Sequence, residues 1–344
     1  MTAWRIPALA VGAVVAALFA GCASAPPAGT GATSAGGTPS GTIPRPAESA
    51  APDLDGRIIF TRAGGAYGDE SLFIANANGT EERRITEVEI GGPARLSPDG
   101  SRVLVNLLEA PPTGPYTGGT VPIDGGLPET LTLTDSALNL APQAWSPDGT
   151  RIAFEGWDDD DPSRNGLYTA RFPDGGDLQR LTSAPNGALD TPADWSPDGR
   201  RLVLYRHEPG AAWDQDGTLW LVNADGTDLR QIDTPDVSPS WWARFSPDGT
   251  RILFGSARLS ADGALWTVDA NGSNLTRVFT DADGRFPITP DWSADGTQIL
   301  FALSPINDEW QHPANEIYVV EADGRGLTLV IGGPDFKREI EWVR

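Results

Sequence analysis

Aromatic and acidic side chains gather in the irregular stretches of this chain, and these residue types are well suited to bind a ligand. Indole rings stack on sugar rings or anchor protein partners, and neighbouring carboxylates add hydrogen-bond acceptors and charge. The predicted binding surface is made of Trp157, Asp158, Asp160, His207, Trp213, Asp214, Trp241, Trp310 and His312.

Four consecutive aspartates, Asp158, Asp159, Asp160 and Asp161, are the candidate for a metal site. Carboxylate oxygens are ligands that Ca²⁺ prefers, so such a run could contribute to a calcium site. Its spacing matches no known calcium-binding loop, and a solvated acidic loop explains the same residues. The solvated loop is the favoured interpretation, and no cofactor is expected.

Sequence patterns typical of catalysis are missing. The chain has no Gly-x-Ser-x-Gly segment and only two histidines, which argues against a Ser-His-Asp hydrolase. The same count excludes a histidine-rich zinc site, and the single cysteine, Cys22, lies in the N-terminal segment. No catalytic residue is predicted, and the protein is not expected to be an enzyme.

The chain is strongly acidic. Its 344 residues include 47 Asp and Glu against 25 Lys and Arg, for a net charge of −22. Binding to nucleic acid needs a basic surface, so a nucleic-acid partner is not expected. The same charge disfavours contact of the body with an anionic membrane, favours a monomeric body and is compatible with a basic protein partner.

The N-terminus has the pattern of an export signal. Arg5 precedes the apolar run Ile6–Ala20, which is shorter than the roughly 20 residues of a membrane-spanning helix. Leu18 to Cys22 resembles the bacterial lipobox, and this resemblance implies cleavage before Cys22 and lipidation of its thiol. Residues 1–21 are therefore the predicted signal peptide. Residues 22–52, rich in Ala, Pro, Gly, Ser and Thr, are the predicted flexible tether.

The rest of the chain is organised by a repeat. Ser-Pro-Asp-Gly occurs at residues 97–100, 146–149, 196–199 and 246–249, and Ser-Ala-Asp-Gly follows at 293–296. Ser, Pro and Gly at these positions favour a type I turn. A large apolar residue precedes each copy and is expected to wedge against the neighbouring repeat: Leu96, Trp145, Trp195, Phe245 and Trp292.

One repeat contains four short strands, expected near residues 142–145, 151–154, 166–170 and 178–181. Four antiparallel strands per repeat of about 50 residues are typical of one blade of a β-propeller. The Asp-Gly and Asn-Gly pairs between the third and fourth strands permit the positive φ of hairpin turns, so they are expected to be structural.

The two ends of the repeat region complement each other. Asp55–Phe60 matches the second half of the repeat, and Glu339–Arg344 matches its first strand. The sequence therefore predicts an all-β, six-bladed propeller of four-stranded antiparallel blades over residues 53–344. Its C-terminal strand is expected to pair into the N-terminal blade and close the ring.

The segment Trp145–Phe154 and its equivalents 195–204, 245–254 and 292–301 resemble the WD40-like (PD40) repeat of the TolB-like propeller family. The resemblance covers about residues 53–344 and implies the six-bladed fold. TolB itself is periplasmic and has an α/β domain before its propeller, whereas residues 22–52 here match only a tether, so a role in a Tol complex does not follow.

In a propeller, the loops from second to third strand and from blade to blade share one face, called here the loop-rich face. The opposite face, with the repeated turns, is called the turn face. We expect the binding surface on the loop-rich face. The expected function is a lipoprotein on the extracytoplasmic side of a bacterial membrane, held there only by its lipid, which binds an envelope protein or glycan without catalysis. The alternatives are a calcium-dependent hydrolase or lyase acting on carbohydrates or lactones, and a scaffold subunit that receives a basic partner.

Overall fold

The computed structural model describes residues 56–63, 70–107, 117–133, 137–208, 217–239, 242–256, 263–305 and 314–343. The predicted signal peptide, lipidation site and tether lie outside these ranges. The same holds for five of the predicted binding residues: Trp213, Asp214, Trp241, Trp310 and His312. Within the described ranges, no helix has both the length and the apolar character needed to cross a membrane.

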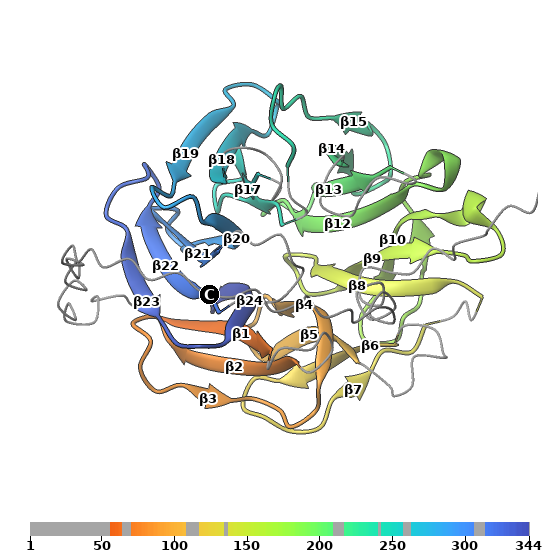
Figure 1. Ribbon diagram of the computed structural model, residues 1–344. Helices are drawn as coiled ribbons and strands as arrows, with labels where there is room; N and C mark the ends of the chain where they lie inside the picture. Colours follow the sequence, from red (N-terminus) through yellow and green to blue (C-terminus); the bar gives the residue numbers. More distant parts are fainter. Residues whose placement is uncertain are drawn as a thin grey trace, which may run out of the picture.

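The described chain is built from antiparallel strands set around a common centre (Figure 1). Four sheets have four strands each, and one has eight. In the figure, β4, β8, β12, β20 and β24 lie nearest the centre, and β3, β7, β15, β19 and β23 lie at the rim.

The four-stranded sheets follow one another along the chain. The first contains β8 (Asn139–Trp145), β9 (Arg151–Trp157), β10 (Gly166–Arg171) and β11 (Gln179–Arg180). The second contains β12 (Leu189–Trp195), β13 (Arg201–His207), β14 (Gly217–Asn223) and β15 (Arg230–Gln231). The third contains β16 (Arg244–Phe245), β17 (Arg251–Gly255), β18 (Ala264–Asp269) and β19 (Thr276–Thr280). The fourth contains β20 (Phe286–Trp292), β21 (Gln298–Ser304), β22 (Glu316–Glu321) and β23 (Thr328–Ile331).

The eight-stranded sheet combines both ends of the described chain. It contains β1 (Arg57–Ala63), β2 (Glu70–Asn76), β3 (Arg83–Arg84), β4 (Ile90–Leu96), β5 (Arg102–Leu107), β6 (Thr117–Pro122), β7 (Glu129–Thr130) and β24 (Phe336–Val343). Strand β24 pairs with β1 in antiparallel register, from Arg57 opposite Val343 to Ala63 opposite Phe336. The first and last described strands therefore belong to the same sheet.

The expectation of six four-stranded blades is wrong. The structure has four four-stranded blades, and the remaining strands form one continuous sheet. The outer strand β3 pairs only with Phe73 and Ile74 of β2, which leaves the start of β2 free for another partner. There Glu70 pairs with Ile90 of β4, and this contact joins the two groups of strands.

The repeated turns have the predicted structural role. In each copy the Asp Oδ1 accepts a hydrogen bond from the Ser hydroxyl and another from the backbone N–H two residues later. In the copy at 146–149 these bonds are 2.6 Å from Ser146 and 3.0 Å from Thr150. Gly149 has φ +70°, a conformation that favours glycine. These aspartates therefore close turns.

The large residue before each turn is buried between sheets, as predicted. The exposed fraction is at most 8 % for each of the five residues, which are Leu96, Trp145, Trp195, Phe245 and Trp292. Trp195, for example, packs with Ala144, Ala153 and Leu167 of the preceding sheet. The hydrophobic core consequently lies in the gaps between neighbouring sheets, which fixes the sheets relative to one another.

Candidate functional site

Carboxylates on the strands nearest the centre bond to the next sheet. Asp291, just before Trp292, accepts a hydrogen bond from the backbone N–H of Trp342 at 2.9 Å. Two equivalent bonds join Asp194 to Phe245 N–H and Glu341 to Leu96 N–H, each at 2.9 Å. Asp291 and Asp194 therefore hold neighbouring sheets together, whereas Glu341 joins β24 to β4 within the eight-stranded sheet.

Two buried arginines balance the charge of this cluster. Arg244 lies 3.9 Å from Asp291 and 4.0 Å from both Asp194 and Glu341, while Arg95 pairs with Glu339 at 3.2 Å. Burial by itself would lower the pKa of Arg244, but Glu341, Asp291 and Asp194 outweigh it and raise that pKa. Burial raises the pKa of Glu341. The cluster is a structural ion network, because its charges face one another.

A second polar cluster lies towards the loop-rich ends of β9 and β12. Asp190, fully buried, accepts two hydrogen bonds from Arg206 at 2.6 and 2.8 Å. Next to it Glu155, 1 % exposed, accepts one from the Thr191 hydroxyl at 2.6 Å. Its other oxygen, Oε1, has no hydrogen-bond partner among the described residues.

The pKa of Glu155 is raised to about 7. The main cause is burial, which Thr191 opposes and the charge of Asp190 reinforces. A carboxyl with such a pKa can exchange a proton near neutral pH, and perturbed groups of this kind are common at functional sites.

The structure places Trp157, a predicted binding residue, in the interior. Its side chain is 3 % exposed and packs with Ala141 and Leu189. Its expected exposure on the loop-rich face is therefore wrong. The misassignment arose because Trp157 ends strand β9 and its side chain turns into the gap between sheets.

Asp158 is 8 % exposed and organises its own loop. Its Oδ1 accepts from the backbone N–H of Asp160 and Asp161, both at 3.0 Å, and its Oδ2 pairs with Arg164 at 2.6 Å. Burial acts to raise the pKa of Asp158, but these three partners outweigh it and lower the pKa.

The other three aspartates of the run are exposed. Asp159 accepts a hydrogen bond from Asn139, and Asp161 caps the short 3₁₀ helix η2 (Pro162–Arg164). Across the described residues, no group of three or more His, Cys, Asp or Glu is arranged to hold a metal ion. The geometry of the run is that of a self-bonded acidic loop.

His207, the remaining predicted residue within the described ranges, ends β13 and is 6 % exposed. Its ring stacks on that of Tyr205, with centroids 6.5 Å apart. Of the four predicted binding residues within the described ranges, the structure brings Trp157, Asp158 and Asp160 into one segment and places His207 in the next sheet, and Asp160 alone of these four is exposed.

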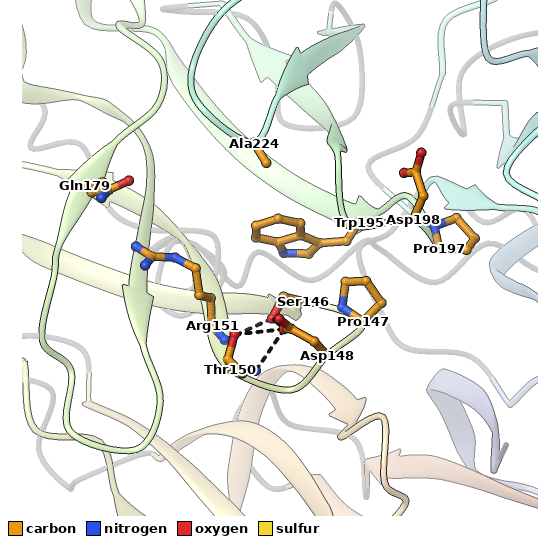
Figure 2. Close-up of a pocket in the computed structure, with 11 residues that line it drawn as sticks. Ser146, Pro147, Asp148, Thr150, Arg151, Gln179, Trp195, Pro197, Asp198 and Ala224 are labelled. Atoms are coloured by element: carbon orange, nitrogen blue, oxygen red, sulfur yellow. Dashed lines mark hydrogen bonds between the residues drawn. The ribbon is translucent and has the colours of Figure 1, made fainter.

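The structure reveals a groove that the sequence did not indicate, shown in Figure 2. It has a volume of about 490 Å³ and lies on the turn face, between the sheets β8–β11 and β12–β15. Its lining comes from two successive turns and the strands beside them: Ser146, Pro147, Asp148, Thr150, Arg151, Gln179, Trp195, Pro197, Asp198, Gly199 and Ala224. Only the repeated positions of Arg151 and Trp195 could have pointed to it.

Antiparallel four-stranded sheets around one centre, each with the repeated turn between its first two strands, define the protein as a β-propeller. A family model described as the TolB beta propeller domain matches residues 123–330. The chain belongs to this family.

Individual relatives agree with this assignment. A protein TolB homolog from Chlorobium luteolum is 34 % identical over 138 residues, which are 39 % of this chain and 27 % of that protein. The match thus spans about a quarter of the length of that relative.

Among solved structures, TolB from Acinetobacter baumannii has a TM-score of 0.61 at 16 % identity, covering 84 % of this chain and 66 % of that one. The putative TolB from Agrobacterium tumefaciens has a TM-score of 0.58 at 18 % identity, covering 83 % and 98 %. An oligogalacturonate lyase in complex with manganese has a TM-score of 0.54 at 15 % identity, covering 76 % and 71 %. Likeness at such identities shows the fold alone.

Proposed function

We propose that this protein is an exported, membrane-anchored propeller that binds a protein partner of the bacterial envelope without catalysis. The TolB family assignment and the export pattern around Cys22 support the location. The groove between β8–β11 and β12–β15 is the observation that carries the binding role. It is open to solvent, whereas the carboxylates of the centre are bonded to the backbone of the next sheet.

A photo-cross-linking amino acid at Gln179 tests this function. Gln179 lines the groove and is exposed, so a partner seated there comes within reach. The control position is Glu87, whose side chain is 88 % exposed in a blade-to-blade loop of the other face. We expect the full chain, expressed in its own bacterium, to form a protein adduct from position 179 and not from position 87. Equal adducts from both positions, or none from 179, would reject the proposal.

A second candidate function is an enzyme acting on carbohydrates, and Glu155 is the observation that favours it. Its pKa of about 7 and its position beside the Asp190–Arg206 pair suit a proton donor or acceptor. The test is to assay the full chain for lyase and hydrolase activity on acidic and neutral oligosaccharides, comparing Glu155→Gln with Glu87→Gln. Activity that only the first substitution abolishes would replace the binding proposal with this one.

A further inference from the structure

In two of the three gaps between consecutive four-stranded sheets, an arginine lies over an aromatic residue. The arginine stands five residues after the Ser of a turn, and the aromatic residue precedes the next turn. Arg251 lies over the Trp292 ring at 4.8 Å from its centroid, and Arg201 lies over Phe245 at 5.9 Å. In these two gaps the protein's own cation covers the aromatic ring.

The gap that contains the groove departs from this pattern. Its arginine, Arg151, instead donates hydrogen bonds to Asp177 Oδ2 at 2.7 Å and to the Thr169 hydroxyl at 3.0 Å. Trp195 is left at the groove, as Figure 2 shows. Its indole N–H has no hydrogen-bond partner among the described residues, but the same is true of the covered Trp292, so the departure lies in the missing cation.

In the gap between the eight-stranded sheet and β8–β11, the arginine is also displaced but the aromatic residue has other partners. There Arg102 is likewise drawn away, to Glu129 at 2.5 Å. The aromatic residue, Trp145, is nevertheless occupied, because Phe172 packs edge-on against it at 4.7 Å and its indole N–H donates to the Arg95 carbonyl at 3.1 Å. Among the residues that the structure describes, Trp195 has neither an edge-on aromatic partner nor an acceptor for its indole N–H.

The groove is also negatively charged. Hydrogen bonds from Ser146 and Thr150 lower the pKa of Asp148, and bonds from Ser196 and Arg200 lower that of Asp198. Both carboxylates line the groove and are ionised at neutral pH. The positive charge of Arg151 is already paired with Asp177. The site therefore combines part of an aromatic ring with two anionic groups.

We propose that this groove binds an arginine side chain from a basic segment of the partner protein. The guanidinium would lie at Trp195, between Asp148 and Asp198, where the neighbouring gaps hold an arginine of the chain itself. A guanidinium stacks on aromatic rings and pairs with carboxylates, and the net charge of −22 favours a basic partner. This inference rests on the proposed function and names the chemistry of its partner.

The test measures binding of a fluorescent peptide of alternating Gly and Arg to the full chain, by anisotropy. The same peptide with citrulline keeps the shape of arginine without its charge, and we expect it to bind at least tenfold more weakly. Asp177→Asn removes the carboxylate that neutralises Arg151 and leaves an uncompensated cation in the groove lining, so we expect at least a tenfold loss of affinity from a change at a half-exposed surface residue. The matched control is Glu129→Gln, which frees Arg102 in the neighbouring gap and should change affinity less than twofold.

Equal binding of the arginine and citrulline peptides, no binding of either, or unchanged binding by Asp177→Asn would overturn the inference. Displacement of the peptide by neutral oligosaccharides alone would assign the groove to sugars and would also overturn it. The two proposals can fail separately. A protein adduct at position 179 that the arginine peptide does not compete away would retain the proposed function and reject this ligand. Peptide binding without any protein adduct would reject the proposed function and retain the groove as a site for arginine.

Discussion

The carboxylate of Asp291 accepts the backbone N–H of Trp342, 51 residues later, at 2.9 Å. Asp194 and Phe245 repeat this relationship at the same separation and distance. A fully buried carboxylate is thus satisfied by the main chain of the next sheet and by Arg244 at 3.9 Å. Such a bond links sheets directly, whereas the strand ladders link only strands within a sheet.

Removing this link should destabilise the whole fold. For Asp291→Ala we expect a loss of about 2–3 kcal/mol in the free energy of unfolding, because a buried N–H loses its partner and Arg244 loses a counter-charge. Urea unfolding followed by tryptophan fluorescence measures this. Asp160→Ala, in the exposed part of the acidic loop, is the control and should change stability by less than about 0.5 kcal/mol. A loss no larger than that control would contradict the structural role of Asp291.

Glu155 should make stability depend on pH near neutrality. Its folded-state pKa of about 7 lies above the ordinary 4.5, so the folded state retains a proton that the unfolded state releases between those values. Ionising the buried carboxyl therefore lowers stability as pH rises from about 4.5 to 7, by up to ~3 kcal/mol.

Glu155→Gln removes this dependence. Parallel urea titrations give the difference in stability between the variant and wild type at each pH. We expect this difference to favour the variant more at pH 8 than at pH 5. Glu87→Gln, at an exposed position, should keep the wild-type dependence. The raised pKa would be disproved by a Glu155→Gln variant whose stability follows wild type at both pH values.

Asp99 should stabilise its turn only while ionised. Hydrogen bonds from Ser97 and Ser101 lower its pKa to about 2, below the ordinary 3.8. Its contribution is therefore present above about pH 4 and is lost as pH falls towards 2. We expect Asp99→Ala to lower the urea midpoint at pH 7 and to differ less from wild type at pH 3. Asp124→Ala, at a side chain 94 % exposed, is the control, and a pH-independent effect at Asp99 would count against this role.

Trp157 should act through packing. Because it is buried against Ala141 and Leu189, Trp157→Ala is expected to cost about 3–5 kcal/mol of stability. Trp157→Phe keeps an aromatic ring in the gap and should cost less, with the adduct at position 179 preserved. Thermal unfolding and the cross-linking assay check both expectations. Loss of the adduct in a folded Trp157→Phe variant would restore Trp157 to the binding surface.

Lipidation at Cys22 remains a prediction from the sequence. Cys22→Ala should move the protein from the membrane fraction to the soluble fraction of the cell, because the substitution removes the thiol that would carry the lipid. Cell fractionation and labelling with a fatty-acid analogue test this, with Ser24→Ala as control. Continued membrane association of the Cys22→Ala variant would reject the lipid anchor.

The turns and the wedge residues were predictable because their chemistry is local. A Ser, a Pro, an Asp and a Gly in succession bring a hydroxyl, a carboxylate and a positive φ into one turn, whatever surrounds it. A large apolar residue just before that turn, such as Trp195, is then directed between sheets. The all-β propeller class and the TolB-like family followed from the same repeat.

The sheet boundaries, the burial of Trp157 and His207, and the groove were decided only by tertiary structure. Glu70 meets Ile90 because β3 is too short to cover β2, which merges strands that the repeat count had separated. Arg151 bonds to Asp177, which lies 26 residues away, and to Thr169, contacts that the repeat does not indicate. Turn chemistry is settled within a few neighbouring residues, whereas exposure and ion pairing depend on which distant segments pack together.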